Sequence, residues 1–186
     1  MRCAVEIAPV RVEPRESAEQ VTQALLHEPL RVTGHAGGWT AIITVYDYPG
    51  WMRAESVEDG DGVLPLPVDG KPLGCALELV GSPYEWGGLT ARGIDCSGLV
   101  HIAYRTSGRL VPRDAWQQEA AGASISQTDA RPGDLVAYGT GARADHIAFW
   151  LGPGRILHAT AREGLGVAIE DEPESLRVAP RRCIRL

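Results

Sequence analysis

Residues 58–72, EDGDGVLPLPVDGKP, constrain the fold of this chain most, because they divide it into two unlike parts. The stretch is rich in Gly, Pro and Asp, which is typical of a linker between folded units. Short strand-like runs come before it, and helical patterns followed by further strands come after it. The sequence therefore predicts two domains, residues 1–57 and 73–186, joined by a linker at 58–72.

The first part of the chain reads as a small all-β domain. It contains four strand-like runs separated by turn residues: CAVEIA, PLRVTG, GWTAIITV and GWMRAE. A polar segment at residues 17–23 is expected to be helical. Several short strands in so few residues indicate a small barrel.

The second part begins with helical patterns. In LGCALELVG, the spacing places Leu73, Leu77 and Val80 on one helical face, with Gly81 as the stop. A Gly-rich loop and a cysteine-containing helix follow, and then a short helix around residues 113–121. These elements form the helical portion of the predicted domain.

Strands dominate the rest of the second part. The Pro-Gly centre of RPGD suits a type II turn, and five strand-like runs follow it: LVAYG, HIAFWL, RILHAT, GVAIE and RCIRL. Helices first and strands after them predict an α+β domain with an antiparallel sheet.

Composition and charge narrow the classes of function. The formal net charge of −6 at pH 7 favours neither nucleic acid nor an anionic membrane surface as partner. No apolar run has transmembrane length, and MRCAVEIAPVRVEPRE at the start lacks the apolar core of a secretory signal. We therefore expect a cytoplasmic protein.

Four cysteines occur without a CxxC spacing, so no zinc ribbon or redox motif is visible. In a reducing compartment, Cys3, Cys75 and Cys183 are expected to be small apolar fillers and not disulfide partners.

Cys96 differs from the other cysteines in its position. It lies in GIDCSGLVHIAYRTSG, directly after Asp95, a good helix N-cap, and before apolar residues at helical spacing that end near Gly108. The first turn of a helix offers unpaired N–H groups and a favourable dipole for a thiolate. The pattern predicts a nucleophilic cysteine.

A thiol nucleophile needs a base, and the base needs an orienting group. His146 and His158 lie in the neighbouring strand-like runs HIAFWL and RILHAT. A three-residue loop, 152–154, would place Ala148 opposite His158 and His146 opposite Thr160, so that the two imidazoles are diagonal neighbours on one face. A two-residue loop would turn one imidazole to the other face.

The predicted roles follow from this arrangement. Cys96 attacks a carbonyl carbon, His146 exchanges the proton, and His158 fixes the tautomer of His146. The amide of Cys96, with help from Tyr84, is expected to stabilise the oxyanion. A zinc site of Cys96, His146 and His158 is the less favoured alternative, and no cofactor is implied.

Five motifs, SPYEWGG, DCSGLV, RPGDLVAY, DHIAFWLG and ILHAT, occur in an order that resembles the NlpC-type cysteine peptidases of bacterial cell-wall metabolism. The resemblance covers about residues 74–186. It implies a papain-like α+β fold with Cys96, His146 and His158 as the catalytic triad. GWTAI and YDYPGWMRA make residues 1–57 similar to a bacterial SH3-like barrel, a domain commonly fused to these peptidases.

The combination resembles enzymes that cut the bond between γ-D-glutamate and a diamino acid, either meso-diaminopimelate or lysine, in murein tripeptides or tetrapeptides. In the subgroup with an N-terminal barrel, residues at the positions of Asp95 and Ser97 read the free amine of L-alanine, assisted by a barrel tyrosine that matches Tyr48 or Tyr46. A role for Asp95 as helix cap alone is the alternative.

A cytoplasmic enzyme of this kind would meet imported murein peptides, which implies a role in their recycling. Two other functions stay open: an amidase or acyltransferase acting on another amide, and a murein-binding protein without catalysis.

Overall fold

The computed structural model describes residues 1–68 and 70–186 and divides into two units, Met1–Leu66 and Pro67–Leu186. The division falls within residues 58–72, the stretch that the sequence predicts as a linker. Asp69, in the same stretch, lies outside the described residues.

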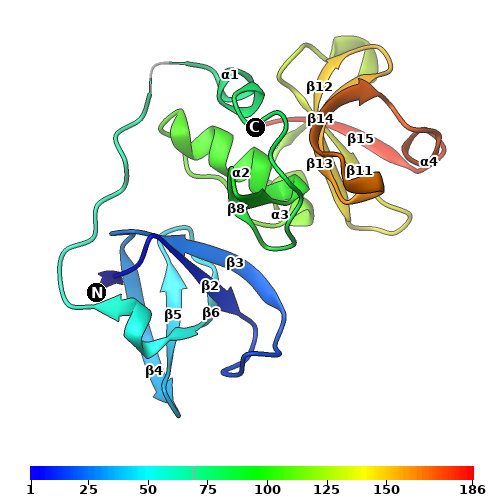
Figure 1. Ribbon diagram of the computed structural model, residues 1–186. Helices are drawn as coiled ribbons and strands as arrows, with labels where there is room; N and C mark the ends of the chain where they lie inside the picture. Colours follow the sequence, from blue (N-terminus) through cyan, green and yellow to red (C-terminus); the bar gives the residue numbers. More distant parts are fainter. Residues whose placement is uncertain (69) are drawn as a thin grey trace. The chain divides into compact units, whose positions relative to one another are not determined.

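The N-terminal unit is a small antiparallel β structure (Figure 1). Its five-stranded sheet has the order β3-β2-β6-β5-β4, and the short strands β1 and β7 pair beside it. The bounds are β1 Arg2–Cys3, β2 Ile7–Arg11, β3 Gln20–Leu25, β4 Leu30–Ala36, β5 Trp39–Thr44, β6 Pro49–Arg53, a 3-10 turn at Ala54–Ser56, and β7 Val57–Glu58. Its core is made by small and branched apolar side chains, among them Val10, Ala24, Ile42 and Met52.

The prediction of a helix at residues 17–23 is wrong. Residues Gln20–Leu25 form strand β3, which pairs antiparallel with β2 and buries Thr22 and Ala24 completely. The ladder gives the backbone of β2 hydrogen-bond partners, and this pairing outweighs the polar composition of the segment. The predicted strand CAVEIA is also divided, into β1 and the start of β2.

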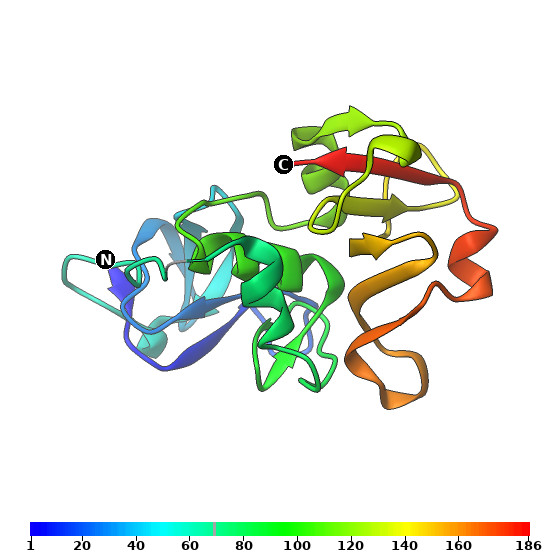
Figure 2. The same cartoon turned by 90° about the horizontal axis from the view of Figure 1, so that it is seen from above.

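The C-terminal unit is an α+β domain with an antiparallel sheet, as the sequence predicts. Its six strands have the order β10-β15-β11-β12-β13-β14 (Figure 2). The elements are α1 Pro72–Leu77, β8 Leu89–Thr90, β9 Gly93–Ile94, α2 Cys96–Thr106, α3 Ala115–Ala121, β10 Ala123–Ile125, a 3-10 turn at Gln127–Asp129, β11 Leu135–Tyr138, β12 His146–Gly152, β13 Arg155–Thr160, a 3-10 turn at Arg162–Gly164, β14 Gly166–Asp171, α4 Glu174–Arg177 and β15 Arg181–Arg185.

Both faces of this sheet are covered. Ile147, Phe149 and Leu157 pack with α2 in the main core, whereas Ala148 and Trp150 belong to a second cluster on the opposite face. The alternation along β12 is therefore the one that a strand requires. Among the described residues, no helix has the length and apolar character needed to cross a membrane.

Two local predictions for the C-terminal unit can be compared with the structure, and one is confirmed while the other is wrong. The type II turn at RPGD is confirmed, since Gly133 has φ +100° and Asp134 N–H donates to Arg131 O at 2.9 Å. The predicted face of α1 is wrong, because Leu77 and Val80 are exposed and Ala76 is fully buried. The helix ends at Leu77, so the periodicity of its sequence does not continue to Gly81.

The hairpin that carries both candidate histidines has the predicted register, in which Phe149 faces Leu157 and Trp150 faces Ile156. This register keeps His146 and His158 on one face of the sheet.

The turn of this hairpin is not the predicted one. Gly152 pairs with Arg155, so only Pro153 and Gly154 connect the strands. Between Trp150 and Gly152 the register shifts, which makes Leu151 a β-bulge. The extra residue in the strand compensates for the shorter loop, and the histidines therefore stay together.

The backbone of α2 at Gly98 lies very close to the backbone of the preceding loop at Gly88. A Cβ at Gly98 would overlap the carbonyl oxygen of Gly88 and lie 2.9 Å from Asp95 Oδ1, whereas a Cβ at Gly74 in α1 would meet nothing within 4 Å. We expect Gly98→Ala to lower the free energy of unfolding by about 1–3 kcal/mol, and Gly74→Ala to raise it by up to about 1 kcal/mol. Urea denaturation of both variants measures this, and equal effects would contradict the close approach.

Candidate active site

Helix α2 begins at Cys96 because Asp95 caps it. The Asp95 side chain accepts a hydrogen bond from Gly98 N–H at 2.6 Å, and its extended backbone ends the preceding segment. A cap of this kind stabilises a helix by about 1 kcal/mol. The predicted position of Cys96 in the first helical turn is thereby confirmed.

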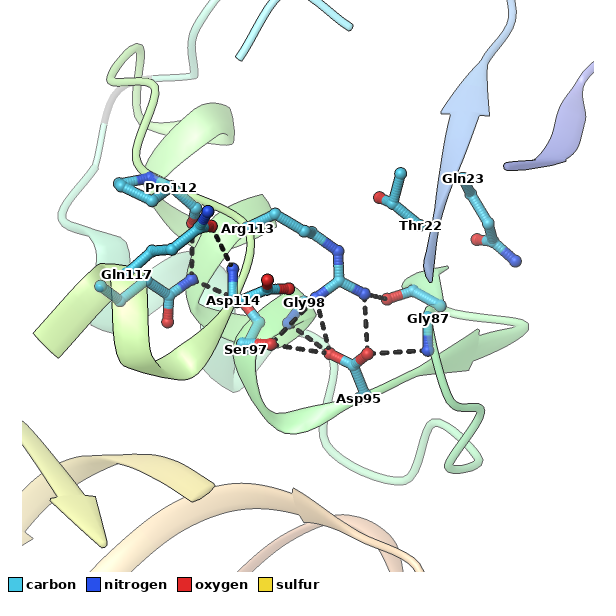
Figure 3. Close-up of polar contacts among 12 residues, drawn as sticks. Thr22, Gln23, Gly87, Asp95, Ser97, Gly98, Pro112, Arg113, Asp114 and Gln117 are labelled. Atoms are coloured by element: carbon cyan, nitrogen blue, oxygen red, sulfur yellow. Dashed lines mark hydrogen bonds and ion pairs between the residues drawn. The ribbon is translucent and has the colours of Figure 1, made fainter. Parts of the chain in front are cut away.

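A buried arginine is the main partner of Asp95. Arg113, 1% exposed, forms a two-pronged ion pair with the carboxylate, Nη1 to Oδ1 at 3.0 Å and Nη2 to Oδ2 at 2.7 Å. Gly87 N–H donates to Oδ2 at 2.8 Å, so both carboxylate oxygens accept hydrogen bonds from the protein (Figure 3). A planar guanidinium matches a carboxylate in this way, and the pair holds its geometry well.

Ser97 belongs to the same cluster. Its hydroxyl accepts a hydrogen bond from Arg113 Nη1 at 2.9 Å and donates to Asp95 Oδ1 at 3.3 Å. The structure therefore brings together Asp95 and Ser97, two of the residues predicted to bind substrate, but with the charge of Asp95 already balanced by Arg113.

The two histidines form a chain with a carboxylate. His146 Nε2 lies 2.8 Å from His158 Nδ1, and His158 Nε2 lies 2.7 Å from Glu170 Oε1. Glu170 also pairs with Arg162. The nitrogens of the two histidines thus bond to each other, and this geometry does not suit joint coordination of zinc at about 2.0–2.1 Å from each nitrogen.

The charge of Glu170 sets the direction of the hydrogen bonds in this chain. Partial burial would raise the pKa of Glu170, but hydrogen bonds from Arg162 and His158 outweigh it and lower that pKa. An ionised carboxylate only accepts, so His158 Nε2 carries the proton that is donated to it. Burial lowers the pKa of His158 despite Glu170, which keeps the ring neutral and leaves Nδ1 as an acceptor.

The tautomer of His146 follows directly. Its Nε2 must donate to His158 Nδ1, so its Nδ1 is without a proton and is free to act as a base. Burial, followed by the charge of His158, lowers the pKa of His146 to about 3. His146 is therefore a neutral base across the physiological range.

Cys96 lies against the start of β12, where the backbone N–H of Ile147, the residue after His146, is directed to its sulfur. Burial and then the charge of Asp95 raise the pKa of Cys96 to about 12, although Ile147, Arg113 and the Ser97 amide act in the opposite direction. The prediction that the helix start favours a thiolate is thus wrong for the ligand-free protein. Desolvation outweighs the dipole, so the thiol of Cys96 and the imidazole of His146 are both neutral in the resting state.

Tyr84 is placed beside the thiol by a backbone bridge to Ile94, which precedes Asp95. Burial, then the charges of Cys96 and Asp95, raise the pKa of Tyr84 to about 12, so its hydroxyl keeps the proton that an oxyanion contact requires. Tyr46 and Tyr48 both lie in the N-terminal unit, where the Tyr46 hydroxyl bonds to Thr22 Oγ1 at 2.9 Å. The roles of Tyr84 and Tyr48 stay predictions.

Sequence reasoning missed Glu170 and Arg113. Glu170 follows His158 by twelve residues, as His158 follows His146, and β13 and β14 pair so that Ala168 faces His158. The register argument used for the first hairpin would have found Glu170 if it had been applied to the second. Arg113 gave no such signal, because a single arginine in a short segment before a helix has no periodicity.

The remaining reactive side chains of interest are the other cysteines and His101. All four cysteines are free thiols, as predicted. His101 is fully buried, and its Nδ1 bonds to Val111 O at 2.8 Å, so it is a structural histidine.

Family models match parts of both units of the chain. Residues 81–176 match the NlpC/P60 family, and residues 10–57 match the bacterial dipeptidyl-peptidase Sh3 domain. The chain is 35% identical over 94 residues to the murein DD-endopeptidase MepS/murein LD-carboxypeptidase of Escherichia coli K12, covering 50% of each chain. It is 35% identical over 111 residues to the gamma-D-glutamyl-L-lysine dipeptidyl-peptidase of Bacillus subtilis, covering 56% of this chain and 37% of that one.

The fold is shared with a solved NlpC/P60 family protein from Bacillus cereus. The TM-score is 0.56 at 20% identity, with 97% of this chain and 61% of that chain covered. The chain spans about half the length of the first curated relatives that it matches.

The tautomers of the histidine chain can be observed directly. We expect long-range ¹H–¹⁵N spectra at pH 7 to show His146 and His158 neutral and protonated at Nε2. In Glu170→Gln an amide replaces the carboxylate and can donate or accept, so His158 should lose its single tautomer. Asp171→Asn, at the exposed neighbouring residue, is the matched control and should leave both rings unchanged. An Nδ1-protonated His146 in the unaltered protein would contradict the proposed direction of the hydrogen bonds from His146 to His158 and on to Glu170.

The resting state of Cys96 can be read from its alkylation rate. Because only the thiolate reacts and burial raises the pKa of Cys96, we expect iodoacetamide to modify it more slowly than free cysteine at pH 7. The rate should then rise about tenfold for each pH unit between pH 8 and 10. Peptide mapping by mass spectrometry resolves Cys96 from the other cysteines. A rate above that of free cysteine at pH 7 would show a standing thiolate.

Proposed function

The chain belongs to the NlpC/P60 family, and on that premise we propose that it is a cysteine endopeptidase that cleaves the γ-D-glutamyl–diamino acid bond of murein peptides. The observation that carries the proposal is the hydrogen-bonded chain His146–His158–Glu170, which leaves an unprotonated nitrogen on His146, in a strand whose next residue touches the Cys96 sulfur. The relatives named as murein endopeptidase and dipeptidyl-peptidase support the substrate class.

The reaction starts from the neutral pair. His146 Nδ1 takes the thiol proton while the sulfur of Cys96 attacks the γ-carbonyl carbon of D-glutamate, and the Cys96 amide and Tyr84 hydroxyl stabilise the oxyanion. His146 then gives the proton to the leaving amine, and a thioester remains. Water, deprotonated by His146, cleaves the thioester and restores the thiol.

His158 and Glu170 act through His146. Each time His146 gains a proton, its positive charge is stabilised by the acceptor at His158 Nδ1 and, beyond it, by the carboxylate. The chain also prevents the ring from turning, because Nε2 is held at 2.8 Å. Both residues are positioning residues for the base.

We propose that the free amine of L-alanine is read at Asp95 and Ser97. The buried pairing with Arg113 supports this, since it holds both side chains ready before substrate arrives. Because Arg113 already balances the carboxylate, the amine is recognised by directed hydrogen bonds more than by net charge. A peptide whose alanine is acylated lacks the donors and binds less well.

The same proposal places the enzyme in the cytoplasm, acting on murein tripeptides or tetrapeptides during recycling. Two considerations support it. A free amine occurs on peptides released from the glycan, and four free cysteines suit a reducing compartment.

Digestion of synthetic peptides tests the proposed activity. We expect L-Ala-γ-D-Glu-meso-diaminopimelate to yield L-Ala-D-Glu, detected by mass spectrometry. Loss of the nucleophile in Cys96→Ala should lower kcat by more than about 10³-fold. Cys75→Ala, a cysteine of helix α1, is the control and should retain activity.

Two further substrates separate the parts of the proposal. An N-acetylated tripeptide should be cleaved at least about tenfold less efficiently. Equal cleavage of the two peptides would refute the proposed recognition of the amine but not the proposed peptidase activity. A murein peptide with a DD bond, the bond class named for the E. coli relative, should stay intact. No cleavage of the γ-D-glutamyl bond by the unaltered protein would overturn the proposed activity.

A further inference from the structure

A pocket of about 500 Å³ lies on the C-terminal unit, between α3, strands β10 and β15, and the loop that precedes His146. Trp116, Gly122 and Ile184 supply apolar lining, and Arg143, Arg182 and Glu119 supply charge. None of these residues belongs to the Cys96–His146–His158–Glu170 chain or to the Asp95 cluster. The pocket is therefore unassigned.

Its charge is positive on a chain whose formal net charge is −6. Arg182 pairs with Glu119, so these two side chains cancel. Arg182 Nη2 is nevertheless buried without a hydrogen-bond partner among the described residues. Arg143 is exposed and has no carboxylate partner in the described chain. One positive charge is left over in the pocket.

Arg143 is held in place although it is exposed. Its guanidinium lies 4.6 Å from the centre of the Trp116 ring, a cation–π contact. This stacking leaves the edge of the guanidinium, with its N–H donors, available to a ligand. A planar guanidinium presented in this way suits a carboxylate.

Helix α3 connects the pocket to both partners of the catalytic pair. Gln118 Nε2 donates to the carbonyl of Ser97, the residue after Cys96, at 2.9 Å. The next residue, Glu119, accepts from the N–H of Ala144 at 2.9 Å, two residues before His146. Arg143 precedes Ala144, so the cationic wall of the pocket lies in the loop that leads into the base.

The chemistry of the base, His146, indicates which part of the substrate would lie near Arg143. His146 protonates the leaving amine, so the diamino acid departs on the side of His146. Meso-diaminopimelate differs from lysine by one additional carboxylate at the end of its side chain. A single unbalanced guanidinium in the loop that leads to His146 would distinguish the two, since it can bind that carboxylate and has nothing comparable to bind on lysine.

We propose that the pocket formed by Trp116, Arg143 and Arg182 binds the side-chain carboxylate of meso-diaminopimelate and makes the enzyme prefer it to lysine. This inference rests on the proposed peptidase function and adds the diamino acid to it. Arg143 binds the carboxylate, Trp116 positions Arg143, and Glu119 neutralises Arg182, so that Arg143 is the guanidinium left to bind.

Paired substrates and paired variants test the preference. We expect kcat/KM to be about tenfold higher for L-Ala-γ-D-Glu-meso-diaminopimelate than for the lysine peptide. Arg143→Gln should raise KM for the diaminopimelate peptide by about that factor with little change in kcat, and should leave the lysine peptide unaffected. Trp116→Ala should act in the same direction, and Trp116→Phe should restore much of the preference.

Arg155→Gln is the matched control, because Arg155 is an exposed arginine at the far end of β13. It should leave both substrates unchanged. Equal kcat/KM for the two peptides in the unaltered protein, or an unchanged KM in Arg143→Gln, would overturn the inference while the peptidase activity stands.

A binding experiment tests the inference without requiring catalysis. Isothermal titration of the unaltered protein with free meso-diaminopimelate and with free lysine should show tighter binding of diaminopimelate, and Arg143→Gln should abolish the difference. If neither peptide is cleaved, the proposed function fails and the titration alone decides for or against the pocket. Equal binding of the two amino acids would decide against it.

Discussion

The hydrogen bond from His158 to Glu170 is the interaction on which the site depends. The ionised carboxylate of Glu170 can only accept hydrogen bonds, so its charge fixes its role. Each imidazole of the hydrogen-bonded chain, in contrast, can donate or accept at either nitrogen. From the carboxylate the proton positions on His158 and then on His146 follow in order, and they end at an unprotonated nitrogen on the base. Without this carboxylate, two imidazoles at 2.8 Å could share their proton in either direction, and the base would lack a defined tautomer.

Burial explains both the stability of this arrangement and its electrostatics. The strands that carry the histidines are covered on both faces, and the second cluster of Ala148 and Trp150 holds β12 from behind. The same exclusion of water raises the pKa of Cys96 and lowers that of His146. A neutral pair avoids the cost of two buried charges, and the charges then appear only as the bond is formed.

Much of the fold, and the pairing of the two histidines, could be predicted from the sequence, since both depend on local patterns. The cap at Asp95, the helix that follows it and the alternation of β12 are all set by neighbouring residues. The segment 17–23 was mispredicted because its strand is imposed by pairing with β2. The bulge at Leu151 was also missed. A three-residue loop, and a two-residue loop with one bulged residue in the strand, give the same register for the rest of the hairpin.

Charge partners distant in sequence could not be found by the same means. Arg113 is separated from Asp95 by 18 positions in the sequence, and Glu119 is separated from Arg182 by 63. Such pairs have no period, and a charged residue in a short helix is ordinarily assigned to the surface. Yet here they perform two different tasks: Arg113 balances a carboxylate and holds it rigid, whereas Glu119 balances Arg182 and leaves Arg143 as the unpaired charge. The proposed selectivity therefore depends on which arginine has a partner, and only the folded chain determines that.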